Sequence, residues 1–141
     1  MIGKELNTVH ELKKKIRDVE RRLQSLRTAA ENLVPVLNGL PHSKGAKSRV
    51  EKIALDIVAT EHELELLRGQ MPLMKSELAD KILHEVNAPD LQTLLILRYV
   101  ECLSFNEIAR RMKYGLRHIF RLHEKFFKDS ICVHIAALSI S

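Results

Sequence analysis

The chain has little of what several protein classes need. Its 141 residues include no tryptophan and only two cysteines, and aromatic residues make up 4%. Two cysteines are too few for the disulfide framework of a small secreted protein, so we expect a reduced, cytoplasmic protein. The N-terminal segment lacks the apolar core of a signal peptide, and the apolar tail at residues 131–140 is too short to span a bilayer. We therefore expect no membrane partner.

Motifs of common catalytic and metal sites are also missing from the sequence. No G-x-x-x-x-G-K-[ST] phosphate loop occurs, and none of the His-Glu pairs is followed by a second histidine at zinc-protease spacing. Cys132 and His134 have no neighbouring cluster that would complete a zinc site. No serine or cysteine stands in a recognisable nucleophile motif. The sequence predicts a protein that is not an enzyme and uses no cofactor or metal.

Charge is abundant, and it is unevenly placed. Lys and Arg number 23 against 18 Asp and Glu, a net charge of +5. Residues 98–128 hold eight Lys or Arg and three Glu, which is also +5, so the remaining fifteen of each sign balance. Positive charge gathered in one segment is typical of a nucleic-acid-binding surface. An ordinary solvated helix face is the alternative reading.

Two long heptad patterns fill the first half of the chain. The first predicts a helix over residues 5–34, and the second predicts a helix that begins at Ser48, with Glu51 completing a capping box. Apolar residues recur at spacings of three and four in both patterns: Val9, Leu12, Ile16, Val19, Leu23, Leu26, Ala30 and Leu33, then Val50, Ile53, Ile57, Thr60, Leu64, Leu67, Met71, Met74 and Leu78. We expect a basic loop between them that runs to about Lys47.

An antiparallel hairpin would pair the two patterns, with Val19 opposite Leu64. In that register Arg22 approaches Glu63, which is favourable. Two other approaches would be repulsive, namely Glu20 with Glu61 and Lys13 with Arg68. Pairing of the same patterns between two chains, in a homodimer, therefore remains open.

Prolines mark two further boundaries. Pro72 predicts a kink or break near residues 70–72, because proline removes a backbone donor and clashes with the preceding turn. Pro89 suits the first turn of a new helix, with Asn87 or Asp90 as its cap. The expected organisation is all-α: a helical coiled-coil hairpin over residues 1–88, a second module over 89–128, and an apolar tail over 129–141. For the tail, a short packing helix, a dimer contact and disorder remain open.

The second module has the pattern of a helix-turn-helix. Ser104 and Glu107 predict a capping box at the start of one helix, whose inward face carries Phe105, Ile108, Ala109 and Met112. Residues 113–115 form the predicted turn, where Gly115 can take a positive φ. A last helix from Leu116 would bury Ile119, Leu122 and Phe126. Its other side would carry Arg117, His118, Arg121, Lys125 and Lys128.

The stretches LLILRYVECLSFNEIARRM and RHIFRLHEKF resemble the promoter-reading region four of bacterial sigma factors. They are closer still to phage-borne sigma-like proteins, including the ArpU- and RinA-type late transcription regulators. In that family the recognition helix typically opens with Ser or Thr and then Arg, and here Gly115 and Leu116 stand in those places. The resemblance implies duplex DNA as a partner and RNA polymerase as a second one.

The leading hypothesis is a sequence-specific transcription regulator. The candidate base contacts are Arg117, His118 and Arg121, because an arginine can bond guanine O6 and N7 in bidentate fashion. The candidate contacts to the DNA backbone are Ser104, Arg111, Lys113, Tyr114, Lys125 and Lys128. Two alternatives stay open: a phage DNA-packaging protein of the small-terminase type, and a coiled-coil adaptor that does not bind DNA.

Overall fold

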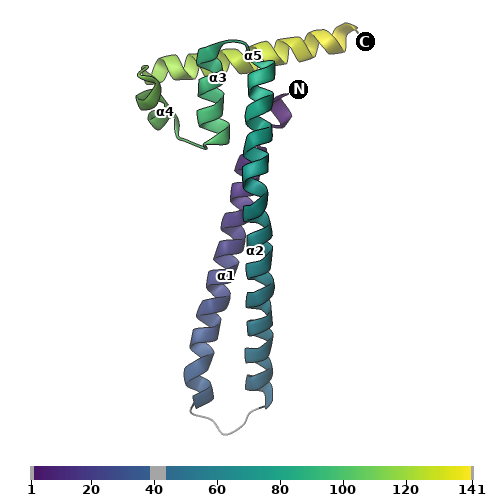
Figure 1. The fold of residues 1–141 in the computed structure, drawn as a ribbon, viewed down its shortest axis with the longest axis vertical. Coiled ribbons are helices and arrows are strands. Elements are labelled where there is room, and N and C mark those ends of the chain that lie inside the picture. Colours follow the sequence, from purple (N-terminus) through teal and green to yellow (C-terminus); the bar gives the residue numbers. More distant parts are fainter. Residues whose placement is uncertain (1, 39–43, 141) are drawn as a thin grey trace. The chain divides into compact units, whose positions relative to one another are not determined.

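The computed structural model describes residues 2–38 and 44–140, and the side chains of residues 3–33 and 48–128. The described chain is all-α, as the sequence predicts, and contains no strand (Figure 1). A short 3-10 turn, η1, precedes two long and three short helical elements before the last long helix. Their bounds are η1 Ile2–Lys4, α1 Thr8–Asn38, α2 Lys44–Glu85, α3 Pro89–Leu95, the π-helical turn η2 Ile96–Val100, α4 Phe105–Met112 and α5 Leu116–Ile140.

Contacts divide the chain into two compact units. One consists of residues 12–71, which include most of α1 and the first part of α2. The other combines the segment up to Glu11 with the chain from Pro72 onward. The turn between α2 and α3, at residues 86–88, lies within this second unit.

The long helices extend further than the sequence patterns predict. α1 continues to Asn38 and α2 already begins at Lys44, so the predicted basic loop is shorter, and residues 39–43 lie outside the described part. The prediction of a helix break at Pro72 is wrong, because α2 runs through this residue to Glu85. Pro72 is exposed, as is Arg68 one turn earlier. Water can therefore solvate the carbonyl group that loses its helical donor at Pro72. For the tail, the sequence left a short packing helix, a dimer contact and disorder open. In the structure the tail is helical, because α5 continues to Ile140.

In the unit of residues 12–71, α1 and α2 run side by side in opposite directions (Figure 1). Val19 and Leu23 of α1 are buried against Leu64 of α2. Ile16, Ile57 and Leu67 pack against this cluster and are only partly buried. The heptad register that places Val19 near Leu64 is confirmed, and in this structure the two patterns meet within one chain.

Ion pairs line the edges of the same seam. Arg22 pairs with Glu63 at 3.5 Å, as the register predicts. The predicted repulsions are wrong for the glutamates, because Glu20 pairs with Arg68 at 2.8 Å and Arg27 pairs with Glu61 at 3.0 Å. In these two pairs each arginine lies roughly one and a half turns along its helix from the position directly opposite its partner. The long arginine side chains reach diagonally across the seam, which a one-to-one register does not anticipate.

The second unit is built around two short helices, α3 and α4, and the long helix α5, which converge. Leu94 of α3, Ile108 of α4 and Ile119 of α5 are each 0% exposed and form one cluster. Partly buried side chains of these helices, of η2 and of the connecting segments pack around it: Leu91, Leu97, Leu103, Phe105, Ala109, Met112, Tyr114 and Leu122. Each fully buried aliphatic side chain contributes on the order of 1.5–3 kcal/mol relative to an exposed one. This cluster therefore fixes how α4 and α5 cross.

Polar contacts join α2 to α3 at the intervening turn. α3 begins at Pro89 with Ala88 as its N-cap, and no side chain caps it, so the predicted caps Asn87 and Asp90 are wrong. The Gln92 amide instead donates to the carbonyl groups of Leu83 and Val86 at the end of α2. These carbonyls lack helical donors, and Gln92 satisfies them.

Candidate nucleic-acid interface

The start of α4 is held by a side-chain cap. The Ser104 hydroxyl accepts a hydrogen bond from the backbone N–H of Glu107 at 3.3 Å, which confirms Ser104 as the N-cap residue. Ile108, one position after Glu107, is fully buried in the cluster of α3, α4 and α5. Glu107, Arg110 and Arg111 are exposed. The cap thus orients a helix whose apolar side faces inward and whose cations face solvent.

The turn between α4 and α5 has a left-handed residue, but it is not the predicted glycine. Lys113 takes φ 59° and ψ 36°, whereas Gly115 has a negative φ. Gly115 acts at the entry of α5, where its carbonyl accepts from His118 at 3.0 Å and from Ile119 at 3.2 Å. Left-handed backbone costs a residue with a Cβ roughly 1–2 kcal/mol. The backbone N–H groups of Lys113 and Tyr114 both donate to the carbonyl of Ala109, and these hydrogen bonds close the end of α4 around Lys113.

Tyr114 ties the turn to the start of α3. Its hydroxyl donates to the carboxylate of Asp90 at 3.0 Å, and its ring meets the His118 ring edge-on with centroids 4.7 Å apart. The hydrogen bond to Asp90 raises the pKa of Tyr114, because an ionised phenol would face a negative carboxylate. Tyr114 and His118 thus have intramolecular roles in addition to the DNA contacts predicted for them.

α5 has two distinct sides. Ile119 and Phe126 are buried and Leu122 is partly buried, as the spacing predicts. All five polar residues predicted for the opposite side are exposed: Arg117, His118, Arg121, Lys125 and Lys128. Arg117 and Arg121 stand four residues apart, so both project from nearly the same direction of the helix. The remaining predicted backbone contacts, Ser104, Arg111 and Lys113, are also exposed, whereas Tyr114 is partly buried.

The cations of α5 differ in how freely they can meet an anion. Lys128 pairs with Glu124 at 3.3 Å, one turn earlier on the same helix. Within the described part of the chain, no ion pair involves Arg117, Arg121 or Lys125. Such side chains can engage phosphate or a guanine edge without first breaking an internal ion pair. Arg110 and Arg111 at the end of α4 add to the same positive charge.

An aromatic group supports α5 from η2. The Tyr99 hydroxyl and His123 Nε2 lie 2.6 Å apart, and the two rings stack. Burial raises the pKa of Tyr99, while burial and the nearby Arg98 charge lower the pKa of His123. Both shifts favour the neutral forms of the phenol and the imidazole. The Arg98 guanidinium in turn lies 4.3 Å from the centre of the Phe105 ring.

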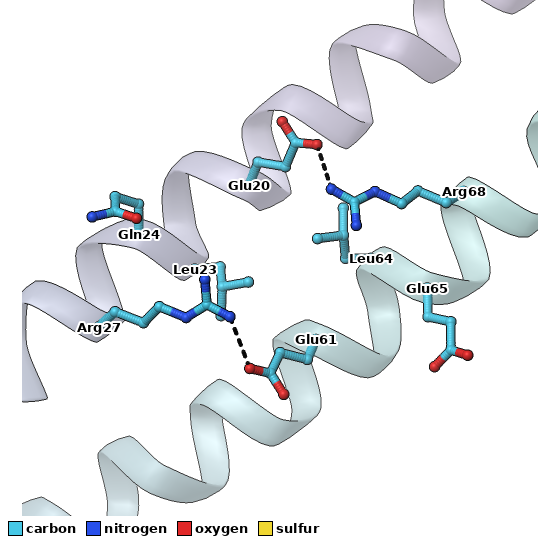
Figure 2. A pocket seen from close by; sticks show the side chains of 8 residues that line it. All are labelled: Glu20, Leu23, Gln24, Arg27, Glu61, Leu64, Glu65 and Arg68. Carbon is cyan, nitrogen blue, oxygen red and sulfur yellow. Dashed lines mark hydrogen bonds and ion pairs between the residues drawn. The ribbon is translucent and has the colours of Figure 1, made fainter.

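A second surface feature lies in the unit of residues 12–71, and it is less suited to a charged ligand. An open hollow between α1 and α2 is lined by Leu23 and Leu64 with charged residues around them (Figure 2). Four of these charges form the two ion pairs Glu20–Arg68 and Arg27–Glu61. A ligand that bound these arginines would have to displace their glutamates. Arg117, Arg121 and Lys125 of α5 form no ion pair in the described part of the chain and face no such competition.

Sequence reasoning overlooked two apolar residues on α5. Leu116 is 38% exposed and Phe120 is 46% exposed, although both are large and apolar. The periodic pattern assigned Ile119, Leu122 and Phe126 to the buried side, and it left Leu116 and Phe120 without a role. The signal that could have found them was their spacing of four, which places them together on one edge of the exposed side.

Comparison of the chain with protein-family models, with curated proteins and with solved structures finds no match. Among the described residues, no three or more His, Cys, Asp or Glu side chains gather in a group that could hold a metal ion. None of the described helices combines the length and apolarity needed to cross a membrane.

Proposed function

We propose that this protein binds duplex DNA in a sequence-specific manner and regulates transcription. In this proposal α4 and α5 form a helix-turn-helix, and α5 enters the major groove. The observation that carries the proposal is the two-sided character of α5. Its buried side is anchored by Ile119 in the cluster with Leu94 and Ile108, and its exposed side carries five predicted polar contacts. The positive charge surplus of residues 98–128 supplies the attraction to phosphate.

The roles of the exposed residues follow from their chemistry. Arg117 and Arg121 are the proposed base readers, since each can donate two hydrogen bonds to guanine. His118 is a further candidate for a base, next to Tyr114. Lys125 and Lys128, with Ser104, Arg111, Lys113 and Tyr114, are the proposed phosphate contacts that fix the register of the protein on DNA.

A duplex-DNA titration at two salt concentrations tests this proposal. The parent should lose affinity as salt rises, with a slope of log affinity against log salt near −0.9 per phosphate contact. Arg117→Ala/Arg121→Ala should remove discrimination between sequences, at a cost of about 1–3 kcal/mol for each base that is no longer read. Lys125→Ala should weaken binding to all sequences alike.

α1 offers a matched control for the double variant. Arg17 and Arg21 have the same spacing of four, are exposed, and form no ion pair in the described part of the chain. Arg17→Ala/Arg21→Ala therefore changes the net charge by the same amount and should leave discrimination intact. If both double variants reduced binding equally, α5 would not be the reading helix.

A packaging protein of the small-terminase type is the second candidate. The observation that favours it is a row of exposed apolar residues on α2, Leu55, Val58 and Leu66, on the side away from the α1 contact. Such residues favour assembly of several copies. The mass of the protein in solution separates the candidates, because a ring of many subunits favours packaging and a monomer or dimer favours a regulator. The adaptor hypothesis fails if duplex DNA binds with a steep salt dependence.

A further inference from the structure

Two apolar side chains stand beside the exposed cations at the start of α5. Leu116 and Phe120 are 38% and 46% exposed, and they lie four residues apart on one edge of the helix. At about 100° per residue, Phe120 lies about 60° from Arg117 and about 100° from Arg121 around the helix axis. Fully buried Ile119 lies about 100° away on the other side. Phe120 thus occupies the border between the buried side and the cationic side.

The Phe120 ring is held in place by a neighbour from α4. The centres of the Phe105 and Phe120 rings are 5.0 Å apart, with a tilt of 53° between their planes. Phe105 is itself in contact with the Arg98 guanidinium, at 4.3 Å from its centre, and with the His123 ring. A ring supported in this way loses little conformational freedom when a ligand covers its outer face. The exposed ring is therefore prepared for a contact.

The surrounding charge indicates what that contact is. Arg117, Arg121 and Lys113 are exposed around the start of α5. A partner that covers the apolar side chains therefore also meets these cations, so it should carry both an apolar group and many negative charges. Duplex DNA offers both an apolar group and negative charge at its major groove. Thymine presents a C5 methyl group there, between the phosphate rows, and phenylalanine is among the side chains suited to contact it.

We propose that Phe120, assisted by Leu116, reads the C5 methyl group of a thymine next to a base read by Arg117 or Arg121. This inference rests on the proposed DNA-binding function and adds a base preference to it. The preferred duplex then contains thymine at a defined position beside a guanine. Arginine supplies the polar part of the recognition, and the Phe105–Phe120 pair supplies the apolar part.

The test begins with selection of bound sequences from a random 20-base-pair duplex pool by the parent protein. The selected duplex is then made with deoxyuridine in place of each thymine in turn, which removes only the methyl group. At one position the parent should bind about three- to fivefold more weakly, the factor expected for loss of one buried methyl. Phe120→Ala should bind the thymine and uracil duplexes equally, and Phe120→Leu should restore part of the preference.

Two controls keep the outcomes separate. Leu83→Ala removes an apolar residue of similar exposure, 49% against 46% for Phe120, from α2 and should retain the thymine preference. Circular dichroism of Phe120→Ala establishes that the helices are intact. If the parent selects a sequence through Arg117 and Arg121 but is insensitive to uracil everywhere, the thymine contact is overturned and the proposed function stands.

The thymine contact is also overturned, and the proposed function stands, if Phe120→Ala weakens binding to both the thymine and the uracil duplex but keeps the parent's preference between them. Phe120 would then support α5 without touching the base, as it would if its exposed face docked another protein. If the parent binds no duplex at low salt, the proposed function fails, and the thymine contact is overturned with it.

Discussion

Residues 12–71 and residues 89–128 bury their apolar side chains in different ways. In the first region two long helices share one seam, where Val19, Leu23 and Leu64 are buried and their neighbours are only partly covered. In the second region α3, α4 and the start of α5 converge on Leu94 and Ile108, which are fully buried together with Ile119. The first region extends a repeating contact, and the second concentrates its contacts at one point.

Polar contacts follow the same division. Around the seam, ion pairs such as Glu20–Arg68 join exposed side chains across the two helices. Around the converging helices, side-chain pairs such as Tyr114–Asp90 are joined by contacts from side chains to backbone groups: Ser104 caps α4, and Gln92 binds carbonyls of α2. Exposed ion pairs contribute little to stability, whereas caps satisfy groups that would otherwise lack a partner. The second region should therefore be more sensitive to single substitutions.

The largest expected effect is removal of a fully buried side chain. Ile108→Ala should lower the free energy of unfolding by an amount in the upper part of the range of about 2–5 kcal/mol. Leu64→Ala should fall in the lower part, because partly exposed Ile57 and Leu67 can move into the space. Urea unfolding followed by circular dichroism gives the totals, and hydrogen exchange locates the loss. Equal losses would remove the distinction between the two regions.

The next effect concerns the cap of α4. Ser104→Ala removes the hydrogen bond to the Glu107 N–H and should cost about 1 kcal/mol. Ser25→Ala provides the control, because Ser25 is exposed inside α1 and should change stability by less than about 0.5 kcal/mol. Both variants are compared by urea unfolding. A Ser104 variant as stable as the control would mean that packing alone sets the start of α4.

A smaller effect is expected from the ion pairs of the seam. Glu20 and Arg68 are 2.8 Å apart, and their side chains are about half exposed. A double-mutant cycle with alanine at both positions should give a coupling of about 0.2–1 kcal/mol, and added salt should reduce it. A coupling well above this range would show that the edges of the seam contribute as much as its apolar centre.

The smallest expected effect on the free energy of unfolding at neutral pH comes from His123. Its folded pKa lies below the ordinary value of 6.5, so the unfolded chain takes up a proton that the folded chain resists. The free energy of unfolding should therefore fall as the pH drops below 6.5. Urea midpoints at pH 7.5 and pH 5.5 measure this fall. His123→Gln should reduce it, whereas His62→Gln, at an exposed position of α2, should not.

Periodicity predicted the side of each helix that is buried. The inward positions Ile108, Ile119 and Phe126 and the outward positions Arg117 and Arg121 were all readable from spacing. The Ser104 cap was readable as well, because its partner is only three residues away. These features depend on residues close together in the chain, so a local pattern contains the information. The DNA contacts proposed for the site residues await the binding experiments.

By itself, the sequence determined that the chain is all-α, which residues face the interior, and that positive charge gathers in residues 98–128. Only the tertiary structure decided that Lys113 adopts the left-handed turn conformation and that Tyr114 binds Asp90. It further decided that the Gln92 side chain donates to a carbonyl group at the end of α2. It also decided which glutamate each arginine meets across the seam. Helical periodicity is a property of neighbouring residues, whereas these contacts depend on where distant segments place their side chains.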